Sequence, residues 1–188
     1  LHKNADWNYE APLLSDIIYV KEAYRAAVEN VLEPYLNYYI VNNLQEGLQA
    51  IQLLDENKKG KANFFLLDQL KGISAVAAPA NTIAALSVLE LDSKYAALAS
   101  QLLGNVFIAE NEQALQAEFD GVLLEKTGKY VKGKYTLTGG SVGIFEGKKI
   151  GRAKNLEKLL ADIQSQEKIV NELKEKIQVK HNAVLEFN

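Results

Sequence analysis

The glycine-rich stretch Thr136-Leu-Thr-Gly-Gly-Ser-Val-Gly-Ile-Phe-Glu-Gly-Lys-Lys-Ile-Gly-Arg152 runs directly into a helix with a heptad pattern. Two sets of apolar residues mark this pattern at seven-residue spacing: Leu156, Ile163, Val170, Ile177 and Val184, and between them Leu159, Leu173 and Phe187. The spacing is typical of a coiled-coil seam, which needs a partner helix. Gln166 and Lys180 interrupt the second set, so we expect an imperfect seam. The sequence predicts a globular unit followed by a coiled-coil helix.

Five glycines fall within the thirteen residues from Gly139 to Gly151, and they need a physical reason. Glycine weakens the interior of a strand or helix, but it permits positive φ angles and close backbone approach. One interpretation is a flexible connector between the globular unit and the coil. The other is that residues 135–143 form an edge strand that lies tightly against another chain. Both interpretations stay open on these residues alone.

The composition describes an ordinary globular protein of 188 residues, 48% apolar and 24% charged. It shows no apolar run of the roughly 20 residues that span a bilayer, so we expect no membrane partner. Cysteine is absent, which excludes disulfides and thiolate zinc sites. Because the chain opens on Leu1 and contains no methionine, we expect it to be a piece of a longer polypeptide.

The net charge of −3 is unevenly distributed along the chain. Residues 148–188 hold 9 of the 21 basic side chains and only 6 of the 24 acidic ones. Four basic residues lie close together where the glycine-rich stretch meets the helix: Lys148, Lys149, Arg152 and Lys154. Such a patch can attract phosphate backbones, although charges that flank a helix more often form a solvated face.

The pattern of helices and strands appears twice before the heptads. In the first series we expect a helix over 20–32, a strand over 38–41, a helix over 44–57 and a strand over 62–67, with Ser15 or Asp16 as a cap before them. In the second we expect a helix over 93–103, a strand over 106–109, a helix over 112–119 and a strand over 122–125. The sequence therefore predicts a mixed α/β (α+β) fold of two similar small subdomains, joined by an alanine-rich linker at 73–81.

Motifs for catalysis are weak. Gly139-Gly-Ser-Val-Gly143 matches the G-x-S-x-G pattern of a nucleophilic serine at Ser141, but the only downstream histidine is His181, within the heptads. The stretch from Gly143 to Lys149 has the wrong glycine spacing for a Walker phosphate loop. The two histidines, His2 and His181, form no ligand set. We expect no cofactor, no metal and no enzymatic activity.

Four pieces of the chain together resemble a specific family, the hinge domains of the SMC (structural maintenance of chromosomes) ATPases, of the bacterial chromosome partition or condensin type. They are Glu22-Ala-Tyr-Arg-Ala-Ala-Val-Glu-Asn-Val-Leu32 with Tyr38-Tyr-Ile-Val41, Gly60-Lys-Ala-Asn-Phe-Phe-Leu-Leu-Asp68, Tyr95–Asn105 with Val106-Phe-Ile-Ala109, and Leu137-Thr-Gly-Gly140 with Gly151-Arg152. The chain lacks the C-x-x-C motif of the related zinc-hook ATPases.

The resemblance implies a hinge of two subdomains at the far end of an antiparallel coiled-coil arm, with the ATPase heads at the other end. It divides the chain into a lead-in from the N-terminal arm (1–15), subdomain I (16–80), subdomain II with a glycine-rich edge (81–151) and the start of the C-terminal arm (152–188). Two hinges pair through strand edges in this family, which places Thr138, Gly139, Gly140 and Gly143 at the dimer contact.

The resemblance also implies partners. They are a second copy of the hinge and the N-terminal arm helix of the same parent chain, with DNA as a weaker partner at Lys148, Lys149, Arg152 and Lys154. The expected role is a non-catalytic homodimerisation hinge that supports DNA entrapment, chromosome condensation and segregation in the cytoplasm, on the nucleoid. The rival interpretation is a nucleic-acid-binding α/β domain that uses the basic junction.

Overall fold

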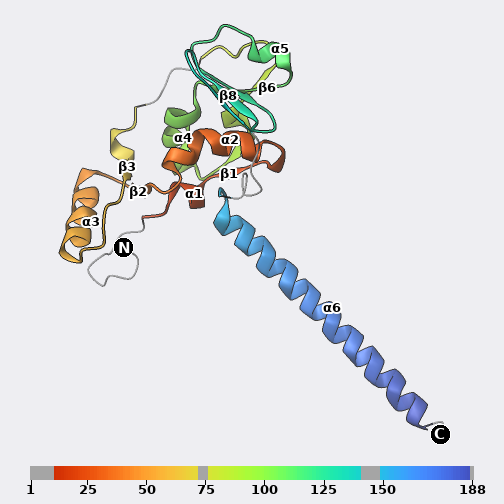
Figure 1. The fold of residues 1–188 in the computed structure, drawn as a ribbon. Coiled ribbons are helices and arrows are strands. Elements are labelled where there is room, and N and C mark those ends of the chain that lie inside the picture. The colour runs from red at the N-terminus through yellow and green to blue at the C-terminus, as the bar shows by residue number, and fades with distance from the viewer. Residues whose placement is uncertain (1–10, 72–75, 141–148, 187–188) are drawn as a thin grey trace. The chain divides into compact units, whose positions relative to one another are not determined.

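The computed structural model describes residues 11–71, 76–140 and 149–186, and it divides the chain into two compact units, Leu1–Arg152 and Ala153–Asn188 (Figure 1). The second unit consists of one long helix, α6 (Arg152–Glu186), whose first residue still belongs to the first unit. No helix among the described residues is long and apolar enough to cross a membrane. The division of residues 16–151 into two subdomains between 80 and 81 stays a prediction.

Residues 11–71, which we call the first half, form a short series of elements. They are α1 (Leu14–Ile17), β1 (Tyr19–Val20), the 3₁₀ turn η1 (Glu22–Tyr24), α2 (Arg25–Leu32), η2 (Glu33–Tyr35), β2 (Tyr39–Val41), α3 (Leu44–Glu56), β3 (Phe64–Leu66) and η3 (Leu67–Gln69). Strands β2 and β3 are parallel, and Leu13 forms an antiparallel bridge with Tyr39 on the other side of β2.

Residues 76–140, the second half, repeat that series and extend it. They form β4 (Thr82–Ala84), η4 (Ala85–Val88), β5 (Leu89–Glu90), η5 (Ser93–Tyr95), α4 (Ala96–Leu103), β6 (Val106–Ala109), α5 (Glu112–Leu115), β7 (Val122–Glu125), β8 (Tyr130–Lys132) and β9 (Leu137–Gly139). Up to β7 each element has a counterpart in the first half. Strands β6 and β7 are parallel, as β2 and β3 are. Strand β4 pairs antiparallel with β6, and Leu13 forms the equivalent antiparallel bridge to β2. The predicted duplication of elements is therefore present.

The duplication extends to the helix caps. Asn43 begins α3 with a side chain that accepts a hydrogen bond from the backbone N–H of Glu46 at 3.0 Å. Asn111 begins α5 in the same way, accepting from Ala114 at 2.9 Å, with nearly the same backbone angles. An asparagine at this position satisfies a backbone N–H that the first helical turn leaves free. The same local chemistry thus starts the helix after each central strand.

The largest sheet lies in the second half and has the order β4-β6-β7-β8-β9 (Figure 1). Strand β9 is antiparallel to β8, with Val131 opposite Thr138, and lies at the edge of the sheet. The equivalent strands β1 and β5 pair antiparallel with each other, Tyr19 opposite Glu90 and Val20 opposite Leu89, and so link the two halves.

One core unites both halves. From the first half it contains Leu14, Ile18, Val28 and Leu32, and from the second Leu98, Leu103, Ile108 and Leu124. Ile150, which Gly151 separates from α6, also belongs to this core. A separate small cluster of Ala11, Val41 and Ala50 lies under α3. Burial of these apolar side chains is the main favourable contribution to the stability of the unit.

Several element boundaries differ from the sequence predictions. The predicted helix over 20–32 is wrong at its start, where β1 and η1 precede α2, and the predicted helix over 112–119 ends at Leu115. Ser15 and Asp16 are not caps, because both lie inside α1 and its N-cap is Leu13. Segments of two to four residues are too short to show a period, and α1, β4, β5 and β8 also lack the run of three or more apolar residues that marks β6 and β7, so the sequence does not predict them.

Candidate functional site

The outermost strand of the large sheet carries two of the predicted dimer-contact residues, Thr138 and Gly139, and Gly140 follows it. All three are exposed. Leu137 on the same strand is 74% exposed, and Tyr135 before it is 88% exposed. Large apolar side chains at an unpaired sheet edge favour pairing with another chain. Gly143, the fourth predicted contact residue, lies outside the described residues.

The two glycines at the end of β9 have different surroundings. A Cβ at Gly139 would lie 2.7 Å from the Cβ of Tyr130 and 2.8 Å from the carbonyl oxygen of Lys129. A Cβ at Gly140 would meet no atom of the described residues within 4 Å. Gly139 therefore allows β9 to approach β8 of its own chain, a use of glycine that the sequence pattern did not reveal. The part of the chain that the structure describes leaves space beside Gly140, so packing against that part does not require glycine.

The hydrogen bonds of β9 show which backbone groups are directed outward. The N–H of Gly140 donates to Lys129 O at 3.0 Å, and the carbonyl of Thr136 accepts from Gly133 N at 2.9 Å. Because these groups alternate in direction along an antiparallel strand, the N–H groups of Leu137 and Gly139 point away from β8. The edge thus presents backbone donors next to the exposed side chain of Leu137.

The first half has a second sheet edge. Among the described strands, β3 pairs with β2 alone, whereas its counterpart β7 is covered by β8. The side chains of Phe64, Phe65 and Leu66 on β3 are all only partly buried. The repeated unit is therefore completed by a β8–β9 hairpin in the second half and ends without one in the first.

The turn between β7 and β8 is fixed in place by polar contacts. A carboxylate oxygen of Glu125 accepts hydrogen bonds from the backbone N–H groups of Thr127 and Lys129, each at 3.0 Å, and from the Thr127 hydroxyl at 2.5 Å. Burial of Glu125 opposes ionisation, but these hydrogen bonds and the Lys129 charge outweigh it, so the pKa of Glu125 is lowered. Gly128 adopts a φ of +84°, and a Cβ there would lie 3.0 Å from the backbone of Ala26. The turn therefore rests directly on α2.

At the start of α6 the predicted basic patch is only partly described. The Nζ of Lys149 forms an ion pair with Glu33 of the first half. Lys154 is half-buried, Lys148 lies outside the described residues, and for Arg152 only the helical backbone is described. The structure brings one further cation to this region, because Arg25 lies 5.4 Å from the ring centre of Tyr19, the side chain against which Gly151 packs. The position of Arg25 in an amphipathic helix did not predict this contact with Tyr19.

The remaining motifs from the sequence acquire no support as catalytic sites. Ser141 and most of the Gly143–Lys149 stretch lie outside the described residues, as does His2. His181 is exposed on α6. In the described part of the chain, no group of three histidine, aspartate or glutamate side chains is arranged to hold a metal ion.

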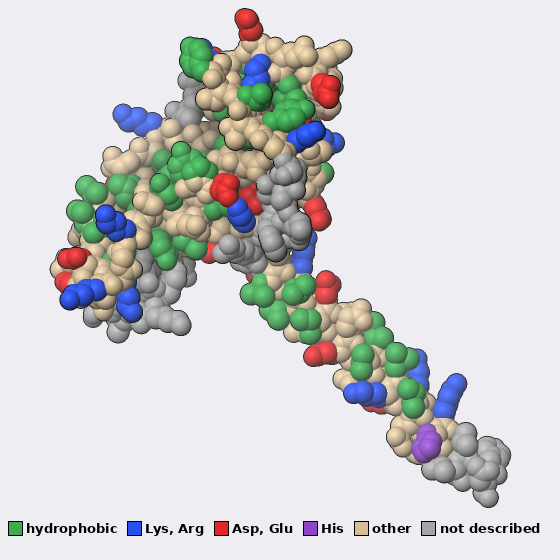
Figure 2. All heavy atoms as spheres, viewed as in Figure 1, with side chains coloured by type: hydrophobic (Ala, Val, Ile, Leu, Met, Phe, Trp, Pro, Cys, Tyr) green, Lys and Arg blue, Asp and Glu red, His purple; other side chains and the backbone are tan. Residues whose placement is uncertain are grey.

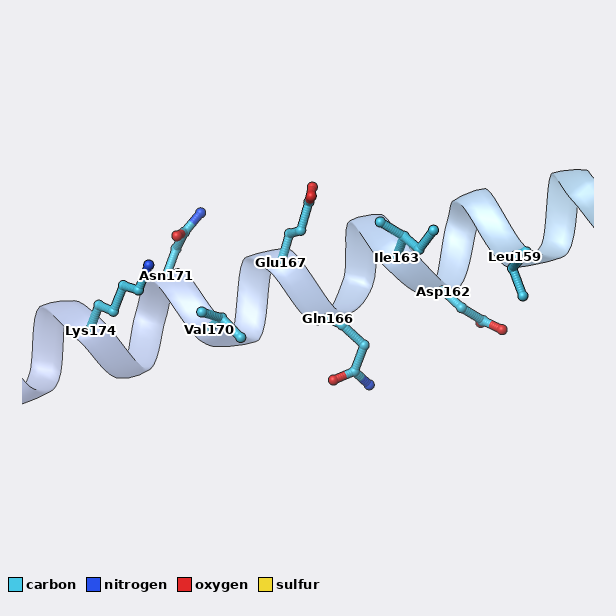
Figure 3. A pocket seen from close by; sticks show the side chains of 8 residues that line it. All are labelled: Leu159, Asp162, Ile163, Gln166, Glu167, Val170, Asn171 and Lys174. Atoms are coloured by element: carbon cyan, nitrogen blue, oxygen red, sulfur yellow. The ribbon is translucent and has the colours of Figure 1, made fainter.

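Helix α6 carries its described heptad residues on its surface, and Figure 2 shows hydrophobic side chains along the helix. Leu156, Leu159, Ile163, Val170, Leu173 and Ile177 are each about half exposed or more. Figure 3 shows Leu159, Ile163 and Val170 along one stretch of the helix, with the polar Gln166 between them. An apolar stripe of this kind on a single helix is the pattern that a coiled coil buries against another helix.

Comparison with known proteins gives the family. The model of the "SMC proteins Flexible Hinge Domain" matches residues 9–117, more than half of the chain. A "Chromosome partition protein Smc" of Methanococcus voltae is 26% identical over 170 residues, covering 87% of this chain and 14% of that protein. The "Structural maintenance of chromosomes protein 4" of Schizosaccharomyces pombe is 28% identical over 161 residues, covering 78% of this chain and 12% of that protein. The chain thus spans about one seventh of these relatives or less.

Solved structures agree on the fold. An asymmetric dimer of the Geobacillus stearothermophilus SMC hinge domain has a TM-score of 0.70 at 23% identity and covers 96% of this chain and 78% of that one. The Pyrococcus furiosus SMC protein hinge domain has a TM-score of 0.65 at 22% identity, covering 73% and 76%. The predicted fold class and the resemblance are therefore confirmed. This chain belongs to the family of SMC flexible hinge domains.

Proposed function

We propose that the chain is a non-catalytic homodimerisation hinge, which joins two coiled-coil arms of a chromosome-organising ATPase at their far ends. The observation that carries this proposal is the pair of sheet edges. Strand β9 ends the second half with outward donors and exposed apolar side chains, and β3 ends the first half without the hairpin that covers its counterpart. A second copy of the chain fits both.

In the proposed dimer, β9 of one protomer pairs with the β3 edge of the other. The two-stranded β2–β3 sheet would then continue into the five-stranded sheet of the partner, and symmetry would repeat the contact at the opposite edge. A two-fold arrangement of this kind closes on itself and leaves neither edge open, so it ends in a dimer and not a fibre. A structural relative is described as a dimer of an SMC hinge domain, which supports dimerisation, whereas the pairing of β9 with β3 rests on the sheet edges of this chain.

The test separates backbone pairing from side-chain packing at Leu137. Proline at this position removes the outward N–H and is tolerated on an edge strand, because the bonds from β9 to β8 do not use that group. Leu137→Ala removes the side chain and keeps the N–H, so it is the matched control. We expect light scattering to give the wild type and Leu137→Ala about 41.6 kDa, twice 20.8 kDa, and to give Leu137→Pro the monomer mass.

Circular dichroism must show that Leu137→Pro is folded. A wild type that is monomeric at micromolar concentration contradicts the dimer. A folded Leu137→Pro that stays dimeric moves the contact away from the β9 edge, and the exposed stripe of α6 then becomes the surface to test.

The partner of α6 follows from the same proposal. The helix would pair with the N-terminal arm helix of the same parent chain in an antiparallel coiled coil. Two protomers joined at the hinge would then support DNA entrapment, chromosome condensation and segregation on the nucleoid in the cytoplasm. The names of the relatives, which describe chromosome partition and chromosome maintenance, support this wider role.

DNA binding at the junction is the second candidate function. The basic residues predicted for it are Lys148, Lys149, Arg152 and Lys154, and the position of Arg25 beside Tyr19 favours an extension of the patch into the first half. The ion pair between Lys149 and Glu33 argues for a modest affinity, because it already offsets one of these charges. A phosphate-contacting site loses affinity steeply as salt rises, so fluorescence anisotropy of labelled DNA at 50 and 200 mM salt, approximately, tests it. Anisotropy that stays at the free-DNA value at both salt concentrations contradicts it.

A further inference from the structure

A buried carboxylate lies beside residues 149–151, which lead into α6 and which we call the connector. Glu29 of α2 is 1% exposed. Its Oε2 accepts a hydrogen bond from the backbone N–H of Lys149 at 2.8 Å and another from that of Ile150 at 3.2 Å. Glu29 and these two residues are 120 and 121 positions apart in the chain. The carboxylate thus ties the chain just before α6 to a helix of the first half.

Two neighbouring contacts hold the same short segment, residues 149–151. The side chain of Ile150 is fully buried in the shared core. The N–H of Gly151 donates to the carbonyl of Ser15 in α1 at 2.9 Å. Gly151 has a φ of +71°, and a Cβ there would lie 3.0 Å from the ring of Tyr19. All of these contacts are made with the first half or the core, and none of those described is made with β9.

The second half contains a helix equivalent to α2, which allows a comparison for the role of Glu29. Helix α4 is the counterpart of α2 and has the same length, and its residue at the position of Glu29 is Ser100. The helix of this repeat therefore folds without a carboxylate. A buried carboxylate is unfavourable unless hydrogen bonds compensate its lost hydration. In α2 the backbone N–H groups of Lys149 and Ile150 are among the donors that compensate Glu29.

We propose that Glu29 is a positioning residue that fastens the connector to α2, so that a pull on α6 is transmitted into the first half and not to the β9 edge. That α6 is an arm under load rests on the proposed function, whereas the fastening itself does not. In a dimer held at β9, this arrangement separates the strand that joins the protomers from the segment that receives the force.

Hydrogen exchange on the 188-residue chain tests the fastening. In Glu29→Ala we expect the amides of Lys149 and Ile150 to exchange about tenfold faster or more, because hydrogen bonds to charged groups are the strong ones, while amides of β6 and β7 keep their rates. Glu29→Gln keeps an oxygen acceptor without the charge, so we expect an intermediate rate at the same two amides. Glu33→Ala is the matched control, since it removes only the surface ion pair to Lys149, and we expect less than about a twofold change.

Wild-type rates at Lys149 and Ile150 in a folded Glu29→Ala chain would overturn the proposal. If Glu29→Ala does not fold, Glu29→Gln decides: faster exchange confined to the two amides supports the fastening, and unchanged or uniformly faster exchange overturns it. The result is independent of the dimer, because a monomeric wild type would contradict the proposed function without altering these amide rates.

Force spectroscopy tests the load path. The chain contains no cysteine, so Lys59→Cys and Lys176→Cys, both at exposed positions, can carry the two handles. We expect α6 to lengthen equally in both proteins, and Glu29→Ala to show an additional extension before the unit unfolds, as the connector detaches. Identical force–extension curves for the two proteins would contradict a load-bearing role for Glu29.

Discussion

The two halves of the hinge share one plan and differ in how each sheet ends. Both place a parallel pair of strands around an asparagine-capped helix. In the second half, β8 covers the edge of β7, and the five-stranded sheet has an interior strand, β6, with every residue buried. In the first half the sheet stops at β3, whose residues are all partly buried. The difference shows that the described strands cover the edge of β7 within the chain and leave β3 at the end of its sheet.

The largest expected effect concerns two equivalent strands, β7 in the second half and β3 in the first. Leu124 on β7 is 0% exposed, whereas Leu66, at the end of the equivalent strand β3, is partly buried. We expect Leu124→Ala to lower the free energy of unfolding by about 2–5 kcal/mol, because it leaves a cavity in the shared core. Leu66→Ala should cost less than half of that. Urea denaturation of both variants at one protein concentration measures the difference, and equal losses would show that β3 is as well packed as β7.

The second prediction separates the two glycines at the end of β9. Valine at Gly139 would force its Cβ within 3 Å of Tyr130 and Lys129 of the same chain, so we expect a loss of about 1–3 kcal/mol in the free energy of unfolding. Valine at Gly140 has open space, and we expect a change within about 0.5 kcal/mol. Urea denaturation checks both. A Gly140→Val variant as unstable as Gly139→Val would mean that the open space beside Gly140 is filled in solution.

The third prediction compares the two helix caps. Asn43 and Asn111 make the same bond, but α3 has thirteen residues and α5 only four. We expect Asn43→Ala to cost about 1 kcal/mol, and Asn111→Ala the same or less, because fewer helical residues depend on the shorter helix. Helical ellipticity should fall in Asn43→Ala alone, and thermal unfolding followed by circular dichroism measures both quantities. A larger loss in Asn111→Ala would contradict this order.

The smallest expected effect is a dependence on pH that arises from Glu125 in the second half. The pKa of Glu125 is lowered from its ordinary value of 4.5 by the hydrogen bonds of the β7–β8 turn. The unfolded chain therefore binds a proton more readily than the folded one, so this stabilisation is present above pH 4.5 and is lost as the pH falls through the folded pKa. Glu125→Gln should remove that part of the acid dependence in denaturation curves at pH 3 to 6, approximately. A variant whose acid dependence equals that of the wild type would assign it to other carboxylates.

The sequence predicted the longer and more regular elements well. Strands at 106–109 and 122–125 are found at the predicted bounds, since runs of four and three consecutive apolar residues give a clear signal. The edge strand predicted within 135–143 is found over 137–139. Its role as the dimer contact stays a prediction.

Other features had no local signal in the sequence. The partner of Glu29 lies 120 positions away, and in a helix such an acid resembles any surface glutamate. The clash that requires glycine at Gly139 depends on the register between β8 and β9, which spacing alone does not give. Both depend on tertiary contacts, and those form only when distant segments meet.

The burial of Ile150 sets a condition on how the chain folds. Leu14 and Ile150 belong to the same core although 136 positions separate them, 150 minus 14. A chain still growing on the ribosome cannot close this core until nearly all of the unit has emerged. The folding rate of the unit should therefore depend on how fast these distant segments meet more than on helix formation. Until they meet, the exposed sheet edges can pair wrongly with neighbouring chains.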